Sequence, residues 1–162
     1  MADRIAGLNL RQAAVIAGLG YLLNPVSYAE FALYPKLVIA GNIVYTSGHL
    51  PVDKSGKLVT GRLGAELDVA AGHRAAQLAG LGILATLRKE LGSLDRVGRV
   101  LKILGAVNCT PEFTQQPAVI NGCSELLAEV FGRDAGVGAR SAIGVGSLPL
   151  GVAVEIEAVF EV

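Results

Sequence analysis

The chain has 162 residues, enough for one domain, and its 14 Lys and Arg residues balance its 14 Asp and Glu residues. Because it has no net charge and no run of more than two basic residues, it lacks the basic patch that nucleic-acid-binding proteins present to phosphates. Hydrophobic residues make up 52% of the chain and charged residues 17%, which predicts that other subunits cover part of the surface.

The N-terminal segment is expected to be a helical extension over residues 1–30, followed by one domain over 31–162. Its apolar stretch, Ala13 to Leu23, is too short to span a bilayer, so no membrane association is expected. The same stretch also fits the core of a signal peptide, and that alternative stays open. Cys109 and Cys123 have no metal-like spacing and are expected to be buried thiols in a reducing cytoplasm.

The domain itself is expected to contain five strands and two helices. Two β-branched runs flank Gly41-Asn42, a pair that is typical of a two-residue hairpin turn. The remaining elements follow in chain order: a helix over 68–91, a strand over 99–110, a helix after Pro111 that ends at Gly132, a flexible loop over 134–139, and strands over 140–146 and 152–162. Each helix has one apolar stripe, so both should cover one face of a single sheet, in an α+β fold.

A GxGxxA pattern spans Gly80 to Ala85, but it lies inside the helix predicted over 68–91. A dinucleotide site needs this pattern between a strand and a helix start. The small residues are therefore expected to serve close packing, and no nucleotide cofactor is predicted. His73 lies in the same helix without a second ligand nearby, which also argues against a metal site.

The last strand carries an alternating pattern with acidic residues on one face. Glu155 and Glu157 share that face, whereas Val154, Ile156 and Phe160 lie on the other and should pack under the helices. Arg140 opens the preceding strand, which is expected to lie beside the last one. A surface salt bridge would explain this charge pattern, and so would an arginine that binds a substrate carboxylate in two parallel hydrogen bonds.

Three stretches of the chain resemble the signature stretches of the RidA (YjgF) superfamily, the reactive-intermediate deaminases. They are GNIVYTSGHLP, ARSAIGVGSLP and VAVEIEAV, and the similarity extends from about Tyr34 to Val162. The resemblance implies a chorismate-mutase-like fold, with a single mixed sheet and two helices on one face. It also implies a homotrimer whose sites lie in clefts between neighbouring subunits.

The resemblance also implies roles for individual residues. Arg140 matches the arginine that holds the carboxylate of an enamine or imine acid, and Glu155 matches the glutamate that activates water. Five further positions are implied to bind the substrate: Tyr34, Ser47, His49, Asn121 and Ala142. The family often has cysteine at the position of Ala142 and glutamine at that of His49.

These matches predict a cytoplasmic enzyme that hydrolyses 2-aminoacrylate-type enamine or imine acids to 2-keto acids and ammonia. The imine carbon is already electrophilic, so neither metal nor cofactor is required. The expected partners are a small carboxylate-bearing ligand and two further copies of the chain. Two alternatives stay open: a trimer that binds small acids without turnover, and a ribonuclease or translation inhibitor, which the neutral charge disfavours.

Overall fold

The computed structural model describes residues 34–162, and the proposed extension at 1–30 lies outside this range. Its strands are β1 (Leu37–Ala40), β2 (Ile43–Thr46), β3 (Arg99–Asn108), β4 (Ala139–Val145) and β5 (Val154–Glu161). Its helices are α2 (Val69–Leu91), α3 (Gln116–Phe131) and the short α4 (Arg133–Gly136), with single 3₁₀ turns, η3 at Leu94–Arg96 and η4 at Pro149–Gly151. This order confirms the predicted succession of strands and helices.

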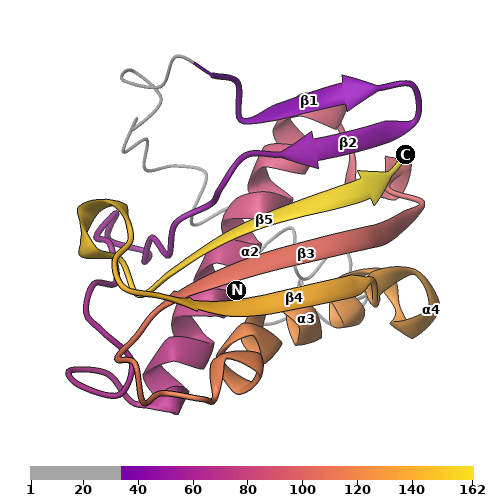
Figure 1. Cartoon of the computed structure of the whole chain (residues 1–162). Coiled ribbons are helices and arrows are strands. Elements are labelled where there is room, and N and C mark those ends of the chain that lie inside the picture. The colour runs from indigo at the N-terminus through magenta and orange to yellow at the C-terminus, as the bar shows by residue number, and fades with distance from the viewer. Residues whose placement is uncertain (1–33) are drawn as a thin grey trace, which may run out of the picture.

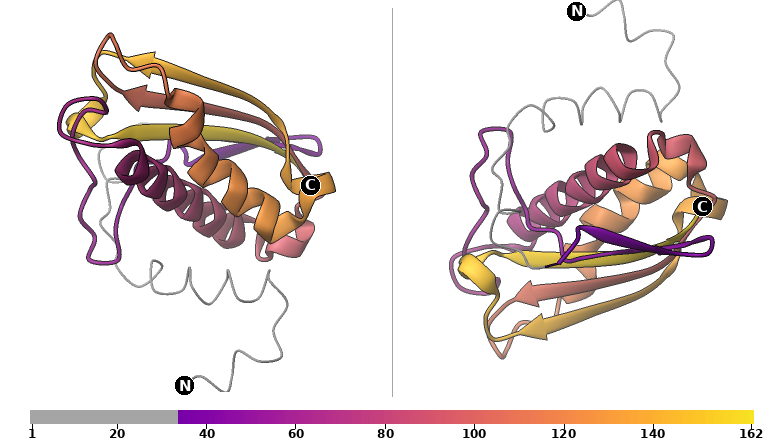
Figure 2. Two further views of the ribbon diagram at one scale, coloured as in Figure 1. Left: turned by 90° about the horizontal axis from the view of Figure 1, so that it is seen from below. Right: turned by 90° about the horizontal axis from the view of Figure 1, so that it is seen from above.

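The five strands form one mixed sheet in the order β1-β2-β5-β3-β4. Only β3 and β4 run parallel, and the other neighbours are antiparallel. Helices α2 and α3 both lie behind the sheet in Figure 1, and the two views of Figure 2 show that they cover the same face. The opposite face, here called the open face, carries none of the helices of residues 34–162. The predicted α+β layer arrangement is therefore confirmed.

The first hairpin turns at the predicted dipeptide. Ala40 pairs with Ile43, so the loop has two residues, and the positive φ of 63° falls on Gly41 alone, as in type II′ turns. Asn42 instead donates its side-chain amide to the Glu161 carboxylate at 3.1 Å. This bond ties the turn to the end of β5.

Helix α2 has the predicted ends. The Asp68 side chain accepts a hydrogen bond from the Ala71 amide at 2.7 Å, and Gly92 ends the helix with a φ of 83°. Within α2 the small residues allow a close crossing with α3, because a Cβ on Gly80 would lie 3.1 Å from the Cys123 sulfur. The GxGxxA pattern therefore serves helix packing, as predicted.

The core lies between the helices and the sheet. Phe160, Ile156 and Ile103 are almost fully buried there, together with the apolar stripe of α3. Cys109 and Cys123 are free, buried thiols, as expected, and burial raises the pKa of Cys123 to about 12. No helix within 34–162 has the length and hydrophobicity needed to cross a membrane.

One predicted loop is ordered. The first residues of the segment 134–139 belong to α4, a single helical turn in which the Gly136 amide donates to the Gly132 carbonyl at 2.6 Å. A side chain at Gly136 would overlap the Leu127 carbonyl of α3. Gly136 therefore permits tight packing against α3, and Gly138 packs against β3, where a Cβ would lie 2.8 Å from the Val100 carbonyl oxygen, so the prediction of a flexible loop here was wrong.

Candidate functional site

Arg140 lies on β4, an edge strand of the sheet, and its side chain lies on the helix side. Its register partner on β3, Ile103, is buried in the core, and residues opposite one another in a ladder share a face. The guanidinium Nη1 donates to Asn121 Oδ1 at 2.8 Å and to Ser124 Oγ at 3.0 Å, both on α3. We call Arg140, Ala142, Asn121 and Ser124 the Arg140 half-site.

The guanidinium has no carboxylate partner within residues 34–162, where the single ion pair joins His73 to Glu125. Its Nε and Nη2 atoms donate to no group within residues 34–162. Neither atom is fully buried, so both can be reached from solvent. A partly buried arginine held on one side and open on the other is suited to binding a carboxylate through two parallel hydrogen bonds.

Glu155 lies on β5 and faces the open side of the sheet. It alternates with Val154 and Ile156, which are fully buried under the helices, and its β3 partner is Ala106. Burial, followed by the like charge of Glu157, raises the pKa of the Glu155 carboxyl above its usual range. A raised pKa makes this carboxylate a stronger base than an ordinary surface glutamate.

The Glu155 carboxyl lies against Gly48, in the segment that follows β2. A Cβ built on Gly48 would overlap Glu155 Oε1 and lie 2.8 Å from Cδ. The preceding residue, Ser47, donates its hydroxyl to the Pro35 carbonyl at 2.7 Å. This bond links the segment to the exposed Tyr34, and we call Tyr34, Ser47, Gly48 and Glu155 the Glu155 half-site.

His49 lies between the sheet and α2. Its backbone exchanges two hydrogen bonds with Ile156, at 2.7 and 3.0 Å. Ring atom Nδ1 is 2.7 Å from the Ser47 carbonyl, which can only accept, so Nδ1 carries the proton and Nε2 accepts from the Thr86 hydroxyl at 2.8 Å. Burial lowers the pKa of His49 to about 4, so it is neutral at pH 7. Its substrate-binding role stays a prediction, with both ring nitrogens already bonded within the chain.

The two half-sites do not meet within one chain. Strand β3 separates β4 from β5, so the expectation that the strands of Arg140 and Glu155 are neighbours was wrong. Arg140 lies on the helix side of the sheet and Glu155 on the open side. A surface salt bridge between them within one chain is therefore excluded by the topology.

The family resemblance implied Asn121 as a substrate-binding residue, but neither its contact with Arg140 nor the role of Ser124 was predicted. The signal was available, since Ser124 follows Asn121 by three residues and both must lie on one face of a helix. The contact of Gly48 with Glu155 had no such signal, because it depends on the pairing of His49 with Ile156 across 107 residues of sequence.

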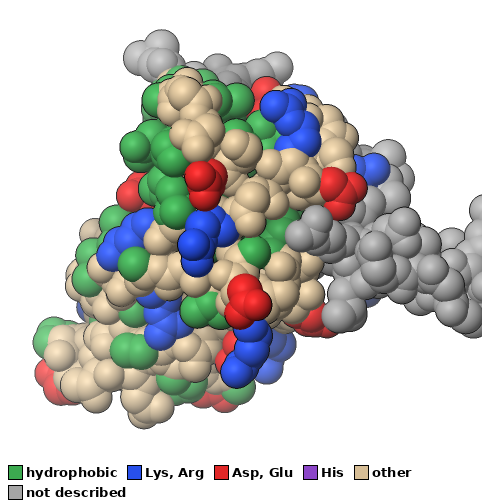
Figure 3. Space-filling model, turned by 90° about the vertical axis from the view of Figure 1, so that its right-hand side faces the viewer, with side chains coloured by type: hydrophobic (Ala, Val, Ile, Leu, Met, Phe, Trp, Pro, Cys, Tyr) green, Lys and Arg blue, Asp and Glu red, His purple; other side chains and the backbone are tan. Residues whose placement is uncertain are grey.

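The open face carries hydrophobic side chains that no other part of residues 34–162 covers. Val38 and Tyr45, which are register partners, are 53% and 50% exposed, and Ile143, in register with Ala106 beside Glu155, is 45% exposed. Figure 3 shows hydrophobic side chains gathered at the upper left, around the β1–β2 hairpin. Apolar groups arranged in this way along a sheet are typical of a surface that meets another chain.

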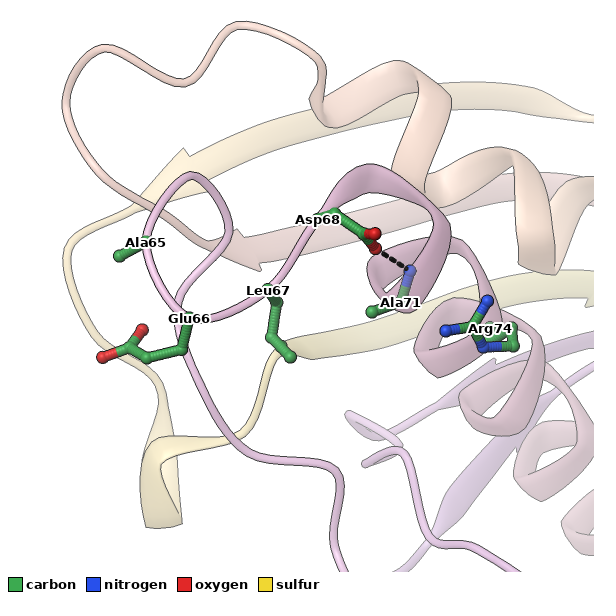
Figure 4. Close-up of a pocket in the computed structure, with 6 residues that line it drawn as sticks. All are labelled: Ala65, Glu66, Leu67, Asp68, Ala71 and Arg74. Atoms are coloured by element: carbon green, nitrogen blue, oxygen red, sulfur yellow. Dashed lines mark hydrogen bonds between the residues drawn. The ribbon is translucent and has the colours of Figure 1, made fainter.

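A separate hollow of about 380 Å³ lies at the start of α2, lined by residues 65–68, Ala71 and Arg74 (Figure 4). Its acidic groups are used locally: Asp68 caps the helix, and Glu66 accepts from the Arg62 amide at 2.8 Å. None of the predicted site residues lines this hollow. Among residues 34–162, no three His, Cys, Asp or Glu side chains gather closely enough to hold a metal ion.

Comparison with known proteins identifies the family. The family model described as "YjgF/chorismate_mutase-like, putative endoribonuclease" matches residues 11–158. The protein TCP17 of Trypanosoma cruzi is 42% identical over 151 residues, which cover 93% of this chain and 94% of the relative.

Two solved structures are similar over nearly their whole length. One is the protein Atu1372 of unknown function from Agrobacterium tumefaciens, with a TM-score of 0.80 and 41% identity over 94% of this chain and 96% of that one. The other, from Shewanella oneidensis and described as a putative endoribonuclease, has a TM-score of 0.84 and 30% identity over 95% of this chain and 100% of that one. The chain therefore belongs to the YjgF/chorismate-mutase-like family, the RidA superfamily.

Proposed function

We propose that this protein is a cytoplasmic homotrimer that hydrolyses reactive enamine or imine acids of the 2-aminoacrylate type, at sites shared between neighbouring subunits. The products are a 2-keto acid and ammonia. The placement of Arg140 and Glu155 on opposite sides of one sheet is the observation that supports a shared site. Two residues with complementary roles that cannot meet in one chain require a second copy to act together.

The surfaces around each half-site are compatible with that assembly. Arg140 lies on the edge strand β4, where a neighbouring chain can approach. Glu155 lies on the open face, among exposed hydrophobic side chains whose burial would stabilise an oligomer. The association of an edge of one chain with the open face of the next would bring an arginine and a glutamate together three times in a closed trimer.

The chemistry needs only a held acid, a held water and a base. Arg140 binds the substrate carboxylate through the guanidinium edge that its contacts with α3 leave free. Holding the substrate in the orientation for reaction lowers the activation barrier by an amount on the order of several kcal/mol. Glu155 of a neighbouring subunit accepts a proton from water as the water oxygen bonds to the imine carbon. The C=N π electrons move to the nitrogen, which takes this proton from Glu155 to give a carbinolamine. The carbinolamine hydroxyl then passes its proton through Glu155 to the amine, so that C–N cleavage releases ammonia as the carbonyl forms.

A dehydratase that releases 2-aminoacrylate from serine supplies the substrate for the test. Keto-acid appearance is measured with and without the protein, and acceleration is expected for the wild type but not for Arg140→Ala or Glu155→Gln. The two inactive variants are then unfolded together and refolded as mixed oligomers. About a quarter of the shared sites in a random mixture would hold both wild-type groups, so partial activity should return.

Each outcome has a distinct meaning. Mixed oligomers without activity, formed from variants that refold individually to the wild-type mass, would show that the site lies within one chain. Wild-type protein that binds 2-ketobutyrate without accelerating keto-acid release would be a non-catalytic carboxylate binder. That second candidate is favoured by Ala142, which lacks the thiol that active relatives often have at this position. Cleavage of RNA by a protein that neither accelerates keto-acid release nor binds 2-ketobutyrate would indicate the ribonuclease alternative.

A further inference from the structure

We propose that Ser124 is a positioning residue for Arg140 and that it determines which edge of the guanidinium faces the ligand. The inference deepens the proposed function and rests on it for the identity of the ligand. Ser124 lies on α3 and touches no predicted reacting group except through Arg140.

The geometry concerns one nitrogen of the guanidinium. Nη1 has two hydrogens, and the two contacts at 2.8 Å to Asn121 and 3.0 Å to Ser124 use both of them. The remaining donors are on Nε and Nη2, which together form one flat edge with two parallel N–H groups. A planar carboxylate matches that edge in a bidentate pair, whereas it would match the opposite edge only if Nη1 were free.

Ser124 and Asn121 are both needed to select this edge. With one acceptor, the guanidinium can pivot about the Nη1–Asn121 bond and sample several orientations. A second acceptor, three residues further along the same rigid helix, binds the other hydrogen of Nη1 and prevents this pivoting. The plane of the guanidinium is therefore fixed before the ligand binds. The hydroxyl of Ser124 is also neutral, so it holds the arginine without competing for its charge as a carboxylate would.

The test compares Ser124→Ala with Ser124→Thr, which keeps a hydroxyl at the same position. Glu129→Ala, at an exposed position on the same helix, is the control. Calorimetric titration with 2-ketobutyrate should show about tenfold weaker binding for Ser124→Ala, recovery to within about threefold for Ser124→Thr, and no change for Glu129→Ala. Thermal unfolding should be similar in all four proteins, which separates positioning from a loss of structure.

A second measurement does not depend on the ligand. In ¹⁵N-labelled wild-type protein at low temperature, the two bonds to Nη1 should slow rotation about the Nε–Cζ bond and give distinct resonances for Nη1 and Nη2 of Arg140. Ser124→Ala should average them.

The outcomes separate this inference from the proposed function. Wild-type binding that Ser124→Ala leaves unchanged would overturn the positioning role, as would Nη resonances that are averaged in both proteins. Absence of binding by the wild type would overturn the proposed ligand class, while the Nη spectra would still decide whether Ser124 orients Arg140.

Discussion

The contact between Gly48 and Glu155 allows a single methyl group to test the proposed base. A Cβ on Gly48 would overlap Glu155 Oε1 and lie 2.8 Å and 2.9 Å from Cδ and Cγ. The φ of Gly48 is not positive, so alanine adds no backbone strain there. The whole effect of Gly48→Ala therefore falls on the glutamate side chain, which must retreat.

The expected magnitude follows from that retreat. Normal contact distances require the carboxylate to move by more than about 1 Å, and a displacement of this size at a reacting group costs on the order of 100-fold in rate. The glutamate is only half-buried and its end is flexible, so the unfolding free energy should fall by less than about 1 kcal/mol. The assay is the dehydratase-coupled release of keto acid, with chemical denaturation as the measure of stability.

Gly146→Ala is the matched control, because its Cβ would meet nothing within 4 Å and its φ is also not positive. It should retain wild-type rate and stability. If Gly48→Ala kept the wild-type kcat while folding normally, the assignment of Glu155 as the base would be refuted. A large loss of stability would instead show that Glu155 cannot move away, contrary to its partial exposure.

Three further predictions follow from other contacts. Glu157→Gln removes the like charge that helps to raise the pKa of Glu155, so the acid limb of the kcat/KM profile should shift to lower pH by up to about one unit, and an unshifted limb would assign the raised pKa to burial alone. His49→Gln should flatten the pH dependence of the unfolding free energy, because His49 has a pKa of about 4 in the folded chain against 6.5 in the unfolded chain, whereas glutamine does not titrate. The contribution of His49 to stability is complete above pH 6.5 and falls by up to about 3 kcal/mol as the pH falls to 4. Chemical denaturation of both proteins at pH 4 and pH 7 measures the difference, and equal losses of stability in the two proteins would contradict the prediction. Gly122→Ala places a Cβ on the His73 carbonyl across the α2–α3 crossing, so it should lower the unfolding free energy by about 1–3 kcal/mol in chemical denaturation, and a neutral result would mean that the helices separate easily.

The local pattern of the chain determined most of the fold. The hairpin at Gly41, the capped helix from Asp68 to Gly92 and the alternation in the last strand are each governed by residues a few positions apart. Such short-range preferences can be recognised in a sequence because turn geometry, capping and periodicity depend on neighbouring residues only. The segment 134–139 was wrongly expected to be flexible because its glycines serve contacts with α3 and β3, which the local sequence does not show.

The arrangement of the candidate site was decided by the tertiary structure. The sequence indicated Arg140 and Glu155, but β3 lies between their strands, and the pairing registers place the two side chains on opposite sides of the sheet. The order and register of the strands depend on pairings between residues far apart in the chain, and a register shift of one residue exchanges the faces of every side chain in a strand without changing the local pattern. For this reason the amino-acid sequence determined which residues are candidates for the proposed chemistry, whereas only the folded sheet decided that Arg140 and Glu155 lie apart in one chain.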